Sequence, residues 1–168
     1  AAGGVHFPLP PATTGETPTL SAGEKTAIYQ VVKEHAKGLP LMPGVGVNSL
    51  PDTLGNIRLL EPLGADALLV VVPYYNKPTQ QGQYEYFKAV AAETSLPIII
   101  YNVPGRTGAN MLPDTVIRLA EEVPNIRGIK EASGNYDQVS EIIRRAPEGF
   151  TVLSGDGGRT LPCLATGR

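Results

Sequence analysis

The stretch ALLVVV, residues 67–72, decides the fold class of this chain. It is apolar on both faces of a strand, which is typical of a parallel strand covered by other layers. Strand ends recur roughly every 24 to 29 residues, near positions 44, 72, 101, 130 and 154. The other strands are expected at 41–45, 97–101, 126–130 and 151–154.

The stretches between these strands have helical spacing. Ser21 and Glu24 have the spacing of a capping box, and Pro113 with Asp114 suits the first turn of a helix. Parallel strands need a crossover connection, which is usually a helix, so the chain is a βα repeat. The expected helices are 22–37, 50–63, 80–94, 113–123 and 135–146.

Such a repeat either spreads as a doubly wound sheet or closes into a barrel. GVGVNS (44–49) supplies only the first two glycines of a dinucleotide-binding turn, which disfavours the first alternative. The barrel is favoured because reactive side chains recur at strand ends, where barrel active sites are built. A closed barrel needs roughly 250 residues, so these 168 residues predict one domain that is the middle of a (β/α)8 TIM barrel. VHFPLPPA (5–12) is a doubtful strand, because its three prolines lack amide hydrogens.

Composition excludes several classes of function. Net charge is −2, and no block of Lys or Arg predicts a nucleic-acid or membrane partner. The apolar runs are too short to cross a bilayer, and no signal-peptide pattern is present. Cys163 stands alone, and His6 and His35 share no ligand spacing with it, so no metal site is expected. We expect a cytoplasmic location.

Lys130, where the apolar strand pattern of NIRGIKEASG (125–134) ends, is the first candidate for chemistry. Alternation places Ile126, Gly128 and Lys130 on one side of the strand. If that side faces the barrel interior, desolvation lowers the pKa of the amine and makes it a nucleophile, and Gly128 leaves space beneath it. Alternatively, the lysine marks only where the strand surfaces into water.

YNVPGRTG (101–108) begins with Tyr101, the last residue of the preceding strand. In a barrel, Tyr101 lies beside Lys130, and its phenol can relay protons. Arg106 offers a forked donor for a carboxylate. A strand-end aromatic followed by a solvated turn explains the stretch equally well.

Three more loops follow strand ends. In ATTGE (12–16), Thr13 and Thr14 form either a carboxylate cradle or a simple turn. PYYNKP (73–78) exposes two tyrosines, either as interface anchors or as loop packing. SGDGG (154–158) has amides suited to phosphate, or is again only a turn.

Taken together, TTGE, PYYNKPTQQG, YNVPGRTG, GIKEASG and LSGD resemble the dihydrodipicolinate synthase family, within the N-acetylneuraminate lyase superfamily. The resemblance runs from about residue 3 to the end of the chain and implies the second to seventh strands of the barrel. The first strand, the eighth strand and a C-terminal helical region of the family are then absent. It also implies a homo-oligomer, a dimer of dimers.

The resemblance implies a class I aldolase-type condensation of pyruvate with L-aspartate 4-semialdehyde, without metal or organic cofactor. Lys130 then forms a Schiff base with pyruvate. Tyr101 and Thr13 match the proton relay, and Tyr75 matches a relay tyrosine contributed by a neighbouring subunit. The product, 4-hydroxy-tetrahydrodipicolinate, leads to diaminopimelate and lysine.

The substrate-binding residues implied are Thr14 for the pyruvate carboxylate, Arg106 for the semialdehyde carboxylate, and Gly155 near the substrate. Asn48 and Tyr74 match an allosteric lysine site, although residues 21–30 lack the histidines common there. The chain also departs from the family at Ala12, where glycine is usual, and in SGDGG. Two alternatives stay open: another pyruvate-dependent lyase of sialic or keto-deoxy sugar acids, and a barrel fragment without catalysis.

Overall fold

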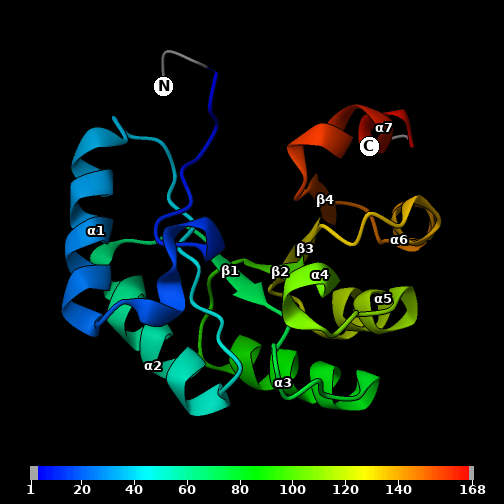
Figure 1. The fold of residues 1–168 in the computed structure, drawn as a ribbon, viewed down its shortest axis with the longest axis horizontal. Helices are drawn as coiled ribbons and strands as arrows, with labels where there is room; N and C mark the ends of the chain where they lie inside the picture. The colour runs from blue at the N-terminus through cyan, green and yellow to red at the C-terminus, as the bar shows by residue number, and fades with distance from the viewer. Residues whose placement is uncertain (1–3, 167–168) are drawn as a thin grey trace.

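The structure, a computed structural model, describes residues 4–166 and is built on one parallel sheet (Figure 1). Its strands are β1 (Leu68–Val71), β2 (Ile98–Asn102), β3 (Ile126–Glu131) and β4 (Thr151–Ser154). They pair in chain order, each parallel to the next. Consecutive parallel strands joined by helices are the arrangement expected of a barrel wall.

Helices form an outer layer around the strands, and the arc of strands does not close within the described residues (Figure 1). The five predicted helices are all present, with ends that differ by at most a few residues. Two further helices, α4 and α7, were not predicted. The helices are α1 (Ala22–His35), α2 (Leu50–Leu60), α3 (Gln80–Ala92), α4 (Pro104–Thr107), α5 (Pro113–Glu122), α6 (Tyr136–Arg145) and α7 (Thr160–Ala165), with 3-10 turns η1 (Thr13–Gly15), η2 (Thr17–Thr19), η3 (Glu61–Leu63) and η4 (Gly157–Arg159).

The prediction of a strand at 41–45 was wrong in detail. Only one bridge forms there, between Gly44 and Leu69. The segment still runs beside β1, because Val45 N donates to Leu69 O at 3.0 Å and Leu69 N donates to Pro43 O at 2.9 Å. Pro43 has no amide hydrogen, so a regular ladder cannot continue through it.

The doubtful strand at 5–12 is not a strand either. Its prolines act only as acceptors: Met42 N donates to Pro8 O at 3.2 Å, and Gly44 N donates to Pro11 O at 2.8 Å. Six neighbouring segments therefore make up the arc, four of them regular strands and two held by scattered hydrogen bonds. The fold-class prediction of a partial TIM barrel is confirmed.

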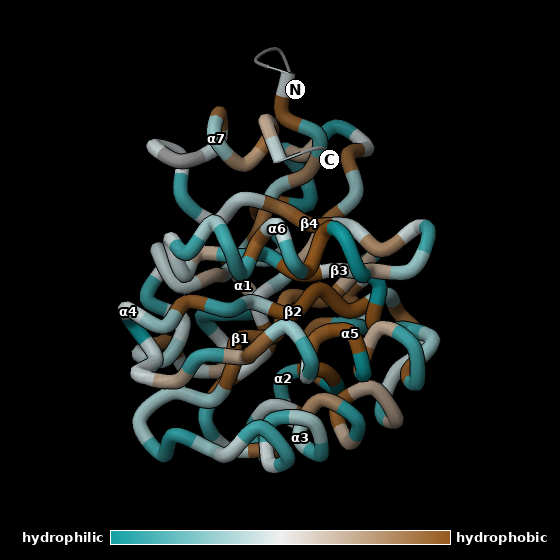
Figure 2. Tube along the Cα trace, turned by 90° about the vertical axis from the view of Figure 1, so that its right-hand side faces the viewer, coloured by the Kyte–Doolittle hydropathy of each residue, from teal (hydrophilic) through white to brown (hydrophobic). Residues whose placement is uncertain are grey.

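Apolar residues lie on both faces of the sheet, as ALLVVV predicts, and Figure 2 shows them concentrated along β1, β2 and β3. Leu68 and Val70 pack toward the helices in the larger cluster. Leu69 packs in the smaller cluster on the concave face, with Ile99 and Tyr101. Burial of a side chain such as Leu68 stabilises the fold by about 1.5–3 kcal/mol.

Strand β3 contains an irregularity that corrects the predicted side-chain alternation. Ile98 pairs with Ile126, but Ile99 pairs with Gly128, so Arg127 is an extra residue. Ile126 therefore packs in the helix-side cluster with Ile129. Such a bulge redirects the side chains that follow it. The premise that Ile126 shares a face with Lys130 was wrong.

The predicted first-turn signals are present in the structure. Ser21 and Glu24 form a complete capping box at α1, and Pro113 begins α5 with Asp114 in its first turn. Within residues 4–166, no helix is long and apolar enough to cross a membrane.

Candidate functional site

Lys130 and Tyr101 lie directly opposite each other across β3 and β2. The Lys130 Nζ is 4.2 Å from the centroid of the Tyr101 ring. Partial burial lowers the pKa of the Lys130 amine, because desolvation disfavours the ammonium form. The face of the ring attracts a cation and so limits this fall. The partly buried Lys130 side chain thus lies over the ring of Tyr101.

The Tyr101 phenol is buried, with 6% of its surface exposed. Desolvation raises its pKa, while the charge of Arg106 and hydrogen bonding with the Thr13 side chain oppose the rise. Two predicted site residues, Thr13 of the ATTGE loop and Arg106 of the YNVPGRTG loop, therefore act on one phenol. A protonated phenol beside an amine can donate a proton to a departing oxygen and recover it later.

Two glycines shape the space around Lys130. A Cβ on Gly155 would lie 2.8 Å from Ala132 Cβ and 3.3 Å from Lys130 Cε. A Cβ on Gly128 would lie 2.5 Å from Thr151 O and 3.0 Å from Ile99 Cδ1. Gly128 thus permits close packing of β3 against β4, and the expectation that it leaves space beneath the lysine was wrong.

A cavity of about 200 Å3 opens beside Tyr101 on the concave face. Its polar side chains combine hydroxyl groups with one guanidinium, and Lys130 is not among its lining residues. These polar side chains are Thr13, Thr17, Tyr74, Tyr101, Arg106 and Thr107. That set suits a small acid with a carbonyl group. The full lining is Ala12, Thr13, Thr17, Pro18, Gly44, Gly46, Leu69, Val71, Tyr74, Tyr101, Val103, Arg106 and Thr107.

The ATTGE loop forms η1, with Thr13 facing the cavity. Ala12 O is its anchor, accepting from Gly15 N and from Thr17 Oγ1, each at 2.8 Å. Thr14 is exposed and is not among the residues that line the cavity. The ATTGE loop therefore forms the predicted turn. Of the two threonines predicted to form a carboxylate cradle, only Thr13 lies near Tyr101.

Arg106 lies on the short helix α4. Thr107 holds this turn, since its Oγ1 donates to Val103 O at 3.2 Å and to Ala109 O at 2.8 Å. Gly108 ends the helix at φ 70°, a conformation that glycine adopts without strain. Arg106 itself is exposed, so the guanidinium is free to meet a ligand at the mouth of the cavity.

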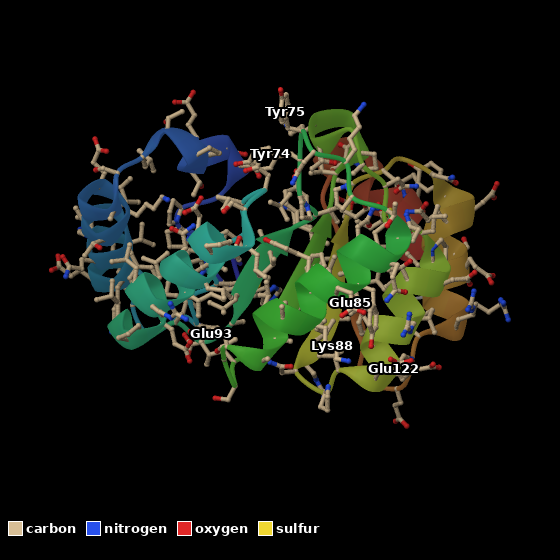
Figure 3. The ribbon with its side chains drawn as sticks, turned by 90° about the horizontal axis from the view of Figure 1, so that it is seen from below. Tyr74, Tyr75, Glu85, Lys88, Glu93 and Glu122 are labelled. Carbon is tan, nitrogen blue, oxygen red and sulfur yellow. The ribbon has the colours of Figure 1, made fainter. Side chains whose placement is uncertain are left out.

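Tyr74 and Tyr75 point in different directions (Figure 3). Tyr75 stands out from the ribbon and is 87% exposed, at a strained φ of 71°. Its amide donates to Thr107 O at 3.2 Å, which ties its loop to the Arg106 turn. Tyr74 lines the cavity and also a second hollow of about 500 Å3 that includes Asn48.

The other predicted binding features gain little support. In SGDGG, the Gly158 amide donates to Asp156 Oδ1 at 3.0 Å, so part of the loop's donor capacity is used internally. His35 Nδ1 lies 2.8 Å from Val31 O on its own helix. Within residues 4–166, no group of three or more His, Cys, Asp or Glu side chains could hold a metal ion.

A buried polar cluster behind Lys130 was missed from the sequence. We call Asn102, Asn110, Glu131 and Gln138 the amide–carboxylate cluster; it joins the ends of β2 and β3 to α6 and to the loop after α4. The only signal for it was a glutamate next to Lys130 in GIKEASG.

A comparison with models of protein families identifies the family of this chain. The sequence model of the dihydrodipicolinate synthetase family (DHDPS) matches residues 10–168. The chain belongs to this family.

Two curated relatives of this DHDPS chain share one name. The 4-hydroxy-tetrahydrodipicolinate synthase of Bacillus subtilis is 51% identical over 156 residues, which are 92% of this chain and 54% of the relative. The synthase of Neisseria meningitidis serogroup B is 53% identical over 156 residues, 92% of this chain and 53% of the relative. The chain spans about half the length of the curated relatives it matches.

Solved DHDPS structures superpose closely on the chain. A structure of DHDPS from Cyanidioschyzon merolae with lysine bound has a TM-score of 0.94 at 42% identity, covering 98% of this chain and 56% of that one. Dihydrodipicolinate synthase from Aquifex aeolicus has a TM-score of 0.92 at 45% identity, with the same coverage. The partial barrel is thus a DHDPS barrel in geometry as well as in sequence.

Proposed function

We propose that the protein is a 4-hydroxy-tetrahydrodipicolinate synthase, a cytoplasmic lyase of lysine and diaminopimelate biosynthesis. The observation that carries this proposal is the desolvated Lys130 amine, 4.2 Å from the ring of Tyr101 in a chain of the DHDPS family. An amine with a lowered pKa is unprotonated more often at neutral pH and can attack a ketone.

The proposed reaction begins with imine formation. The Lys130 amine attacks the ketone carbon of pyruvate, and the carbonyl oxygen leaves as water with protons relayed by Tyr101. The imine withdraws electrons from the neighbouring methyl group, which loses a proton and becomes an enamine carbon. No cofactor is needed, because the protonated imine is the electron sink.

The enamine carbon then attacks the aldehyde carbon of L-aspartate 4-semialdehyde. The aldehyde oxygen becomes a hydroxyl group, and the imine is restored. The amino group of the semialdehyde attacks the imine carbon, which closes the ring and releases Lys130 as a free amine. The product is 4-hydroxy-tetrahydrodipicolinate.

The other predicted site residues bind substrate or relay protons. In this proposal Thr13 connects Tyr101 to the proton relay, Thr14 grips the pyruvate carboxylate, and Gly155 keeps room beside the imine. Arg106 binds the carboxylate of the semialdehyde, which its exposed position at the cavity mouth supports. Arg106 also argues against relatives that cleave sialic or keto-deoxy sugar acids.

We further propose that the active protein is a homo-oligomer, a dimer of dimers. Tyr75 supports this, because an aromatic side chain that is 87% exposed on a strained backbone is suited to a contact outside its own subunit. In the same scheme, Asn48 and Tyr74 contribute to a site for free lysine. The hollow that they share supports this assignment.

Borohydride reduction in the presence of pyruvate tests the central step. The full-length protein should become covalently modified at Lys130, as identified by peptide mass spectrometry. Lys130→Arg should stay unmodified, and Lys88 provides an exposed lysine in the same digest for comparison. Absence of modification at Lys130 in folded protein would overturn the proposal. Turnover of sugar acids in place of aspartate semialdehyde would replace it with the lyase alternative.

A further inference from the structure

We propose that the amide–carboxylate cluster positions Lys130 and the Arg106 turn relative to Tyr101. This inference rests on the proposed function and concerns how the reacting groups are held in place. It assigns a role to Glu131, Asn102 and Gln138, none of which lines the cavity beside Tyr101.

Glu131 is the centre of the cluster and is 4% exposed. Its carboxylate accepts from Asn102 Nδ2 at 3.2 and 3.1 Å, from Gln138 Nε2 at 3.0 Å and from Ser133 N at 2.7 Å. None of the ion pairs found among the described residues includes it. Each of these hydrogen bonds comes from a neutral N–H group, so the position of the carboxylate depends on how the amides are oriented.

The cluster adjoins the reacting pair in the sheet register. Tyr101 pairs with Lys130, and the next pair is Asn102 with Glu131. Side chains of successive strand residues point to opposite faces, so one pair faces the concave side while the next joins the strand ends from behind. Asn102 O also accepts from Ala132 N at 2.8 Å. Strand ends fray unless they are tied, and here they are tied beside Lys130.

The same cluster reaches the turn that carries Arg106. Asn102 Nδ2 donates to Asn110 Oδ1 at 2.9 Å, and Met111 N donates to Asn102 Oδ1 at 3.0 Å. Asn110 and Gln138 exchange two hydrogen bonds, at 2.9 and 3.2 Å. The loop that follows α4 is thereby fixed to β2 and to α6. One buried network thus sets the spacing of the amine, the phenol and the guanidinium.

Exchange of amide and carboxylate tests this role without changing volume. Glu131→Gln introduces an NH2 group where the surrounding groups are themselves hydrogen-bond donors. Asn102→Asp places a second carboxylate against Glu131. Each single change should break the contact between the strand ends. The double variant Asn102→Asp with Glu131→Gln restores one donor and one acceptor across that pair. Asn110 Oδ1 then loses the donor from residue 102 and keeps the one from Gln138 Nε2. The double variant should recover much of the lost geometry.

Asn125 offers a matched control at the other end of β3. Its amide donates to Ala91 O at 2.9 Å and to Thr94 O at 2.8 Å, so it also ties loops together. It lies outside the cavity beside Tyr101. Asn125→Ala should lower stability without altering the reacting pair.

Two readouts separate positioning from stability in the full-length protein. The first is the rate constant of borohydride-trapped imine formation at saturating pyruvate, per folded molecule. A shift of the amine should slow it by at least about tenfold in each single variant, since misplacement by about 1 Å costs up to about 100-fold. The second is hydrogen exchange of the Ala132 and Gly155 amides, which bond to Asn102 O and Glu131 O and need no pyruvate.

The proposal predicts that both single variants exchange faster at these amides and trap imine more slowly, and that the double variant reverses both effects. Unchanged exchange in the singles, unchanged trapping despite faster exchange, or a double variant no better than the worse single would each overturn it. If Glu131→Gln fails to fold, Asn102→Asp and the double variant still decide. If the wild-type protein forms no imine, the proposed function is wrong. The hydrogen-exchange rates then test by themselves whether the cluster ties the strand ends together.

Discussion

The Lys130 Nζ lies 4.2 Å from the centroid of the Tyr101 ring, and the two residues pair across β3 and β2. An amine and a phenol at this spacing are held by backbone pairing rather than by a direct side-chain hydrogen bond. Their chemistry therefore depends on small features of the strands.

Gly155→Ala should slow imine formation. The new Cβ would lie 2.8 Å from Ala132 Cβ and 3.3 Å from Lys130 Cε, so the lysine or its strand must shift. We expect about a tenfold loss in the trapping rate with pyruvate, and a loss of about 1–3 kcal/mol in the free energy of unfolding. Gly157→Ala is the matched control in the same loop, because its Cβ would meet nothing within 4 Å. Equal trapping rates in the two variants would contradict this account.

Imine formation at Lys130 should follow an apparent pKa below 10.5, the ordinary value for lysine. Desolvation is the cause, since it favours the neutral amine that attacks pyruvate. The pH dependence of the trapping rate measures this value, and N-α-acetyl-lysine provides the unburied reference. A profile that coincides with the reference would refute the desolvation argument.

The same pKa shift has a consequence for stability. The folded protein releases the Lys130 proton at a lower pH than the unfolded chain, so the cost of burying the ammonium is fully present below the folded pKa. Stability then rises with pH until the unfolded chain also loses its proton, near 10.5. Lys130→Met should therefore be more stable than wild type at neutral pH, with an advantage that shrinks as the pH approaches 10.5. Urea titrations across this range measure the difference.

Arg106→Ala should weaken the semialdehyde step selectively. Losing a charge-assisted contact of about 1.5–3 kcal/mol should raise KM for aspartate semialdehyde by about 10- to 100-fold. Trapping of pyruvate alone should change much less, because the effect of Arg106 on the reacting pair is the charge that it places near Tyr101. Steady-state kinetics with each substrate varied in turn distinguish the two. An equal loss in both steps would place Arg106 in pyruvate binding instead.

Substitution of Tyr75 should lower turnover without lowering the stability of the fold. Tyr75→Phe removes only the hydroxyl of a side chain that is 87% exposed, so the free energy of unfolding should change by less than about 0.5 kcal/mol. Turnover should fall by about 100-fold or more if the hydroxyl relays protons.

The Tyr75 backbone gives a matched pair of variants. At φ 71°, Tyr75→Gly should be about 1 kcal/mol more stable than Tyr75→Ala, because only glycine adopts this conformation without strain. Chemical denaturation of the two proteins measures it. Equal stabilities would show that the loop does not hold this conformation in solution.

The order of helices and strands could be predicted from the sequence because both depend on local periodicity. ALLVVV gave β1 within one residue at each end, and the Ser21 and Glu24 spacing gave the cap of α1. The prediction at 41–45 was less successful, because Pro43 and the prolines within 8–11 can only accept backbone hydrogen bonds from neighbouring segments. Hydrogen bonding between distant segments is not a local property.

The motifs also indicated which residues carry chemistry. They did not predict which of these side chains face the concave side of the sheet. Lys130 points to the concave face although Ile126 does not, since the extra residue Arg127 breaks the alternation between them. Thr14 shares a motif with Thr13, yet only Thr13 lines the cavity. The tie between Asn102 and Glu131 has no sequence pattern, because the two lie 29 positions apart.

The amino-acid order alone determined a chain of alternating strands and helices, with an amine, a phenol and a guanidinium placed after strand ends. It did so because hydrophobic period and capping act over a few neighbouring residues. Only the tertiary structure decided that the Lys130 amine is partly dehydrated and lies over Tyr101. Desolvation and register come from the packing of whole strands, and that packing includes an irregularity at Arg127 that no local pattern reveals.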